Sequence, residues 1–250
     1  MVKLHADWPV PDNIVAFTSC RSGGISQAPF NSLNLGAHVG DSLQAVTTNR
    51  ELLQGSCVGL KSTQWLNQVH GNRVILAGID GSPDADACYT RERGLACAVM
   101  TADCLPVLFC DEQGQQVACA HAGWRSLLTG IIENTAKTFS CAAKKLLVWL
   151  GPAIGQQHFE VGQEVLQAFV DASPQAVRSQ IEQAFVPNSQ RSSYYFADLY
   201  QLARIRLTLL GIERVYGGEY CCYSDQQRFF SYRRDTTTGR MVSLIYKCVE

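Results

Sequence analysis

Two apolar runs joined by a turn signal near the middle of the chain constrain its fold most. Leu105–Cys110 and Gln116–Ala120 are both strand-like, and Asp111–Gly114 between them is typical of a β-hairpin turn. A hairpin brings its outer ends together at one edge of a sheet. Cys104, before the first run, and His121, after the second, are therefore predicted to lie close together in space.

Other segments carry strand or helix patterns of their own. Strands are predicted over Ile14–Thr18, Leu95–Thr101, Leu146–Leu150 and Met241–Tyr246, with a strand–turn–strand unit over Ser62–Ala77. Helices are predicted after an N-cap at Asp41 or Ser42, from Gly123, after Gly162, and from Asp198 to Gly211. A chain of 250 residues holds one or two closely packed lobes, and we predict an α+β fold.

Composition excludes several classes of function. Lys and Arg number 21 against 22 Asp and Glu, so the net charge of −1 provides no broad basic surface for nucleic acid or an anionic membrane. No run approaches the roughly 20 apolar residues that a membrane span needs. The 11 cysteines are odd in number and several lie in apolar runs, which indicates free thiols in a reducing, cytoplasmic protein. Small molecules are the expected partners.

A long aperiodic segment follows the first predicted strand. Ser19–Asp41 contains four glycines, but also apolar residues such as Ile25, Phe30 and Leu33. Loops longer than about 15 residues are uncommon in a compact domain unless they are functional or disordered, and the apolar residues argue against disorder. We predict an ordered loop that lines a site, with a packed surface loop as the alternative.

His70 stands just before a Gly-Asn turn signal and can join the pair at the hairpin edge. Two imidazoles and a thiolate suit zinc, and three protein ligands leave a fourth position open for catalysis. Two other interpretations use the same atoms. Cys104 can be a nucleophile with His121 as its base and Asp103 or Asp86 orienting the imidazole. The third interpretation is a core thiol beside two hydrogen-bonded histidines.

Three arginines surround a turn before the last predicted strand, at Arg233, Arg234 and Arg240. Arginines in exposed turns are usually solvated, and this is the default interpretation of all three. A contact with phosphate is the alternative, because the planar guanidinium matches the geometry of phosphate oxygens.

Seven segments, taken in order along the chain, resemble the YfiH/laccase-domain family. They are CRSGGISQAPFNSLNLGAHVGD, NQVHG, DADACYT, TADCLPVLF, AHAGWRSLLTGI, WLGPAIGQQHFEVG and SDQQRFFSYRRDTTTGRMVSLI. The resemblance covers nearly the whole chain and implies a single domain over residues 1–250, with mixed, largely antiparallel sheets flanked by helices. It also implies a metal site at the histidine of NQVH, the cysteine of TADC and the histidine of AHAGW, which are His70, Cys104 and His121. Zinc is the expected metal, with copper as the alternative.

The resemblance implies more than one activity. Members of the family have been described as polyphenol oxidases or laccases. Others resemble purine nucleoside enzymes that phosphorolyse adenosine, inosine, guanosine and methylthioadenosine and deaminate adenosine, and bacterial relatives have been linked to the editing of peptidoglycan precursors. Multicopper oxidation needs a histidine-rich set of ligands, and a chain with 5 histidines and no His-x-His pair does not favour it. A binding module for a nucleotide is the non-enzymatic alternative.

Purine chemistry gives roles to residues near the end of the hairpin. Free N–H groups at the helix start after His121 favour an anion, and Arg125 or Arg50 is predicted to bind phosphate. Trp124 or Phe30 is predicted to stack on the base. The expected substrates are thus a nucleoside and phosphate.

Overall fold

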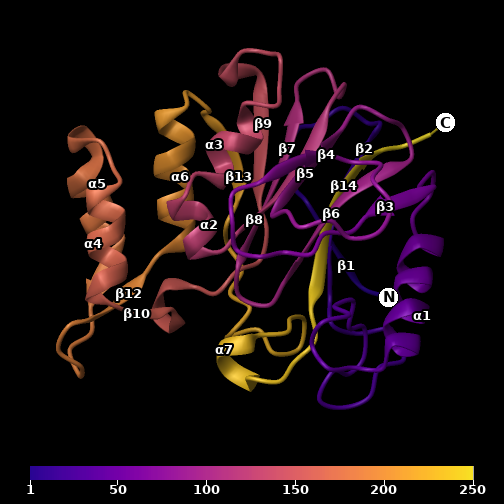
Figure 1. Ribbon diagram of the computed structural model, residues 1–250, viewed down its shortest axis with the longest axis horizontal. Coiled ribbons are helices and arrows are strands. Elements are labelled where there is room, and N and C mark those ends of the chain that lie inside the picture. The colour runs from indigo at the N-terminus through magenta and orange to yellow at the C-terminus, as the bar shows by residue number, and fades with distance from the viewer. Residues whose placement is uncertain (250) are drawn as a thin grey trace.

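The computed structural model describes residues 1–249 and has four layers (Figure 1). Helices α2 (Trp124–Leu128), α3 (Ile131–Ala136) and α6 (Leu199–Leu209) cover one face of a six-stranded sheet, and a five-stranded sheet packs on its other face. Helix α1 (Leu43–Gly55) covers the far side of the second sheet. The predicted α+β fold with largely antiparallel sheets is confirmed. No helix within the described residues is long and apolar enough to cross a membrane.

The six-stranded sheet holds the predicted hairpin at its centre. Its strand order is β13 (Arg214–Gly217), β9 (Leu146–Leu150), β7 (Leu105–Asp111), β8 (Val117–Ala122), β5 (Ala87–Thr90) and β4 (Val74–Leu76). β7 and β8 pair antiparallel, with Leu105 opposite Ala122 and Pro106 opposite His121. The hairpin is therefore confirmed, and Cys104 and His121 lie at the same edge of this sheet.

The five-stranded sheet joins the two ends of the chain. Its order is β1 (Lys3–His5), β2 (Ile14–Ser19), β14 (Met241–Lys247), β6 (Leu95–Thr101) and β3 (Ser62–Gln64). Met241 stands opposite Thr101, so the start of β14 and the end of β6 meet at one edge. The two strands predicted within Ser62–Ala77 are present as β3 and β4, but they lie in different sheets because the loop between them crosses from one sheet to the other.

A smaller unit extends from the helical side of the molecule, where it lies at the left of Figure 1. It contains a three-stranded sheet in the order β10 (Glu160–Gly162), β12 (Tyr194–Ala197) and β11 (Phe185–Pro187), with helices α4 (Gln163–Asp171) and α5 (Arg178–Gln183). The other short helices are α7 (Tyr232–Asp235) and the 3-10 helices η1 (Ala143–Lys145), η2 (Gln156–His158) and η3 (Gln175–Val177).

Strand β7 shows how the layers are held together. Its side chains alternate in direction, as a strand requires. Leu105, Val107 and Phe109 pack in the core beneath the helices, whereas Leu108 and Cys110 pack between the two sheets. All five side chains are fully buried. Burying a large apolar side chain contributes about 1.5–3 kcal/mol, so the hairpin that carries the site is a rigid part of the fold.

Helix ends follow the sequence signals, with one exception. The Ser42 hydroxyl accepts a hydrogen bond from the backbone N–H of Ala45 and caps α1, and the Asp198 carboxylate caps α6 in the same way. The single helix predicted from Gly123 is wrong, because the segment forms two short helices, α2 and α3. Gly130 between them has a φ of 92°, which interrupts the helical path.

Candidate functional site

His70, Cys104 and His121 converge at the edge of the six-stranded sheet, and their potential ligand atoms all lie within 4.8 Å of one another. Cys104 immediately precedes β7, His121 lies on β8, and His70 comes from the loop between β3 and β4. The Cys104 Sγ atom is 3.9 Å from His70 Nε2. The hairpin thus places two of the residues, and a third chain segment supplies the other.

The backbone at this cluster adopts conformations that residues other than glycine rarely take. His70 has a φ of 58°, and Asp103, next to Cys104, has a φ of 94°. Such conformations cost of order 1–3 kcal/mol each and persist where the surroundings hold them, often at functional sites. At Asp103 the backbone N–H of Arg233 donates a 2.6 Å hydrogen bond to Oδ2. This contact ties the residue before Cys104 to helix α7.

Asp86 connects the two histidines of the cluster. Its fully buried carboxylate accepts from the backbone N–H groups of Val69, His70 and Gly71 at 3.2, 3.0 and 2.7 Å. It also lies 2.8 Å from His121 Nδ1. One carboxylate therefore fixes both the His70 loop and the His121 ring. Of the two acidic residues considered from the sequence, it is Asp86 that contacts the imidazole.

Gly123 leaves the room that the cluster needs. A β-carbon at this position would lie 3.0 Å from Cys104 Sγ and 3.2 Å from His70 Cδ2. Both separations are tighter than ordinary van der Waals contact, so a side chain here would displace the candidate ligands. The glycine that precedes α2 is therefore part of the site.

Electrostatics favour a thiolate beside an imidazolium in the metal-free protein. Burial raises the pKa of Cys104, but the charge of His121 and the hydrogen bonds from both histidines outweigh it and lower the pKa to about 6. For His121, burial lowers the pKa, but Cys104 and Asp86 raise it to about 9. Metals bind thiolates rather than thiols, so Cys104 is prepared for a metal at neutral pH.

Cys104 is expected to be unusually reactive toward alkylation once any metal is removed. Because the thiolate is the reactive form and the pKa is about 6, the rate should rise through a midpoint near pH 6 and level off above it. Treatment of chelated protein with iodoacetamide between about pH 5 and 9, with peptide mapping by mass spectrometry, measures this profile.

Cys141 is the internal control for that profile. It is also partly exposed, but burial and the nearby Asp111 carboxylate raise its pKa. Its alkylation should still be increasing where that of Cys104 has levelled off. A midpoint for Cys104 near the ordinary thiol value of about 8.5 would contradict the geometry described above.

The cluster opens into a cavity of about 340 Å³, within the range of about 300–1,000 Å³ typical of small-molecule sites. Besides the cluster it is lined by side chains from several segments, namely His38, Gln68, Met100, Thr101, Ala102, Tyr232 and Arg240. His38 belongs to the long loop after β2, so this loop is ordered and lines the cavity beside the cluster. The other lining residues were not predicted from the sequence, apart from Arg240, for which a contact with phosphate was the alternative interpretation.

The residues predicted to contact substrate lie outside this lining. Arg50 stacks on the Trp65 ring at 3.8 Å and donates to the Leu35 carbonyl at 3.0 and 2.9 Å. Trp124 packs against the core beneath the helices, and the exposed Arg125 stacks on it at 4.3 Å. Phe30 is buried in its loop. Arg50 approaches the cavity through a 3.7 Å contact with the sulfur of Met100, which lines it.

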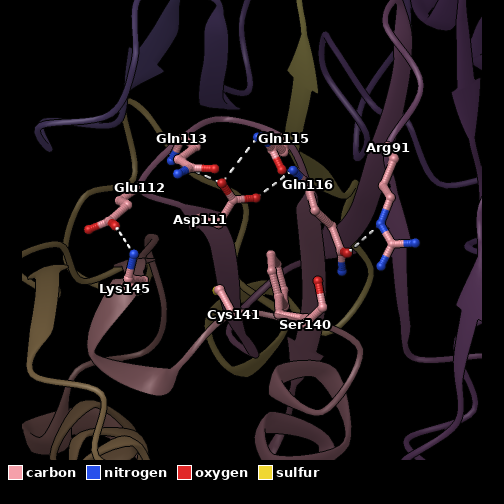
Figure 2. A pocket seen from close by; sticks show the side chains of 10 residues that line it. Arg91, Asp111, Glu112, Gln113, Gln115, Gln116, Ser140, Cys141 and Lys145 are labelled. Atoms are coloured by element: carbon pink, nitrogen blue, oxygen red, sulfur yellow. Dashed lines mark hydrogen bonds and ion pairs between the residues drawn. The ribbon is translucent and has the colours of Figure 1, made fainter.

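A second, smaller cavity of about 110 Å³ lies at the opposite end of β7 (Figure 2). The polar groups around it are already paired with one another. Asp111 accepts from the backbone N–H groups of Gln113, Gln115 and Gln116, and Lys145 pairs with Glu112 at 2.8 Å. Because these groups satisfy each other, this cavity is a weaker candidate for a ligand site than the one beside Cys104.

The donor set fits a metal ion. Two imidazoles and a thiolate are zinc ligands, and the 3.9 Å between Cys104 Sγ and His70 Nε2 can be bridged by one ion with ligand bonds of about 2.0–2.3 Å. The contact between Asp86 and His121 Nδ1 matches the carboxylate–histidine pairs that support metal sites. The cluster is thus a potential metal site.

The sequence matches a known protein family over most of its length. The model of the family described as multi-copper polyphenol oxidoreductase laccase matches residues 15–248. The chain belongs to this family. A Pseudomonas aeruginosa protein named purine nucleoside phosphorylase PA4543 is 50% identical over 97% of each chain. The purine nucleoside phosphorylase YfiH of Escherichia coli is 48% identical over 96% of each.

Solved structures of similar proteins share the fold. A Neisseria meningitidis protein superposes with a TM-score of 0.92 at 47% identity and covers 99% of both chains. YlmD from Geobacillus stearothermophilus superposes with a TM-score of 0.83 at 29% identity and covers 95% of this chain and 93% of its own. The resemblance inferred from the sequence motifs is therefore confirmed over nearly the whole chain.

Proposed function

We propose that this protein is a zinc-dependent purine nucleoside enzyme that phosphorolyses adenosine, inosine, guanosine and methylthioadenosine and deaminates adenosine. The observation that carries the proposal is the His70–Cys104–His121 cluster opening into a cavity large enough for a small molecule. The names of relatives at 48 to 50% identity support the substrate class.

The three clustered side chains would hold the metal, with copper as the alternative to zinc. When bound there, zinc supplies Lewis-acid activation at the open side of the cluster. Asp86 keeps the His121 ring oriented by accepting from Nδ1, which leaves Nε2 as the ligand atom. Gly123 keeps the space beside Cys104 free.

The two reactions make different demands on the cavity. In phosphorolysis the bond between the purine nitrogen and the sugar carbon breaks, a phosphate oxygen bonds to that carbon, and the phosphate proton ends on the purine. In deamination, water replaces the amino group of adenosine and ammonia leaves. Both require a neutral nucleoside to bind beside the cluster, and only the first requires a second, anionic substrate.

Laccase chemistry fits the residues poorly. The family description refers to several coppers, whereas the chain has 5 histidines in all. His5 lies on β1 and His158 on η2, away from the cavity lining. Too few imidazoles converge for a set of copper centres. We therefore do not extend oxidation of polyphenols to this chain.

Two other reactions would use the same cluster. A hydrolase acting on an amide bond of a muramoyl-peptide precursor would need the same activated water. A metal-free cysteine hydrolase would use the Cys104 thiolate with His121 as its base, which is favoured by the lowered pKa of Cys104. The cysteine hydrolase should therefore stay active after a chelator removes the metal.

Product analysis separates these candidates. Protein of known metal content is incubated with the four nucleosides and with muramoyl-peptide precursors, with and without phosphate, and products are identified by mass spectrometry. We expect free purine and a pentose 1-phosphate that appear only with phosphate, and inosine from adenosine in either condition. Chelation should abolish both and added zinc should restore them. Turnover of muramoyl precursors alone would contradict the proposal.

A further inference from the structure

Arg240 stands at the edge where the two sheets meet the cavity. It immediately precedes β14, whose first residue, Met241, pairs with Thr101 at the end of β6. Arg240 and Thr101 therefore leave the five-stranded sheet at the same edge, and both line the cavity that contains Cys104. The sheet topology thus places a cation in the same cavity as the candidate metal cluster.

The side chain of Arg240 is held in place by the protein. Its Nη1 donates to the carbonyl oxygens of Thr238 and Gly239 at 2.9 and 3.1 Å. Its stem passes over Gly36, where a β-carbon would lie 2.7 Å from the Arg240 Cγ atom. Its backbone N–H donates to Asn34 Oδ1 at 2.9 Å. The long loop after β2 thus fixes this arginine, and its orientation is set before a ligand binds.

The other edge of the guanidinium has no protein partner. Within residues 1–249, neither Nε nor Nη2 of Arg240 makes a hydrogen bond or ion pair, and the residues that line the cavity include no Asp or Glu. Asp103, the nearest acidic residue to Cys104 in the chain, acts on Arg240 through its charge, while its Oδ2 accepts from the backbone N–H of Arg233. An arginine presents two parallel N–H groups along this edge, which matches an oxyanion.

Thr101 brings a second unpaired polar group to the cavity. Its side chain is only 1% exposed, it lines the cavity, and its hydroxyl has no hydrogen-bond partner among the described residues. A buried hydroxyl without a partner is uncommon in native proteins, and a bound water or ion can supply the missing partner. Thr101 can donate to the same anion that the free edge of Arg240 attracts.

We propose that Arg240, assisted by the Thr101 hydroxyl, binds the inorganic phosphate that attacks the nucleoside. This assignment rests on the proposed phosphorolysis and goes beyond it, because it places the anionic substrate at the β6–β14 edge and not at Arg125 on α2. The phosphate oxygen that bonds to the sugar carbon then comes from the Arg240 side of the cavity. Arg240 touches the substrate and is in this sense a catalytic residue.

The test compares Arg240→Met, Arg240→Lys and Arg125→Met with Arg178→Met, an exposed arginine on α5 that serves as the control. Steady-state kinetics give the KM for phosphate and kcat in phosphorolysis, and adenosine deamination is measured without phosphate. Thermal melts with and without phosphate report binding independently of turnover. Melting without phosphate and zinc content show whether each variant is folded and loaded.

Arg240→Met should raise the KM for phosphate by roughly ten- to a hundredfold, as expected for loss of a charge-assisted pair of hydrogen bonds. Arg240→Lys should lie between it and the wild type, because lysine keeps the charge but not the paired N–H groups, and phosphorolysis should lose more activity than deamination. An unchanged KM for phosphate in Arg240→Met, or a larger change in Arg125→Met, would overturn the assignment.

The melts separate failure of this assignment from failure of the proposed function. If the wild type phosphorolyses no nucleoside, the proposed function fails, but phosphate should still raise its melting temperature and this rise should be lost in Arg240→Met. A rise of equal size in both proteins, or no rise in the wild type, would overturn the phosphate site itself.

Discussion

Replacing Cys104 by alanine should remove bound metal and nucleoside turnover together. Cys104 is the one sulfur in the cluster, and two imidazoles alone hold zinc far more weakly than two imidazoles and a thiolate. We expect metal content to fall from about one to below about 0.1 ion per chain. The value of kcat/KM for phosphorolysis should fall by at least about a thousandfold. Elemental analysis and product formation measure the two effects on the same preparation.

Cys141→Ala is the matched control, because Cys141 is also a partly exposed free thiol but lies at the opposite end of β7, beside the cavity of Figure 2. It should leave metal content and turnover unchanged. Small losses of stability are expected in both variants and do not distinguish them. If metal-free Cys104→Ala protein phosphorolysed nucleosides at the wild-type rate, the cluster would not be the centre of the reaction.

Replacing Asp86 by alanine should have the second largest effect, on both metal affinity and stability. The substitution leaves three backbone N–H groups and the His121 ring without their acceptor. Because buried donors without partners are costly, we expect the free energy of unfolding to fall by roughly 2–4 kcal/mol. Zinc affinity should fall by roughly ten- to a hundredfold, as when other carboxylates that orient metal-bound histidines are removed. Denaturant titration and competition with a chelator measure these quantities.

Asp84→Ala provides the control for Asp86→Ala. Asp84 lies two residues away but is exposed, and its carboxylate accepts from the Asn67 side chain at 2.7 Å. Its removal should cost no more than about 1 kcal/mol and should not change zinc affinity. Equal effects of the two substitutions would mean that Asp86 does not position the cluster.

Local signals predicted the elements that carry the site. The turn at Asp111–Gly114 fixed the pairing of β7 with β8, and this pairing alone brings Cys104 and His121 together. The caps at Ser42 and Asp198 also lie where the residue types placed them. These features depend on residues close in sequence, so the sequence alone was sufficient to predict them.

Long-range pairing could not be predicted in the same way. Nothing in Met241–Lys247 indicates that it lies between β2 and β6, because this placement depends on packing between distant segments. The interruption of the helix after Gly123 depends on the left-handed conformation of Gly130. The cavity lining follows from these arrangements, which is why Arg240 stood out as one arginine of three near a turn and not as part of a site.

His70 illustrates the limit most clearly. A histidine before a turn is more often structural than a ligand, and only the family resemblance pointed to it from the sequence. In the structure its position follows from Asp86, which binds the backbone of residues 69–71 and the His121 ring at once. The contact that assembles the cluster thus joins residues 15 to 35 positions apart.

X-ray absorption spectroscopy on quantified, purified protein tests whether His70, Cys104 and His121 hold zinc. We expect about one zinc ion per chain, bound by one sulfur at about 2.3 Å and two imidazole nitrogens at about 2.0–2.1 Å. The sulfur contribution should be absent from any metal that remains in Cys104→Ala. A protein that binds no metal, or binds it without a sulfur ligand, would contradict the assignment of these three residues as a metal site.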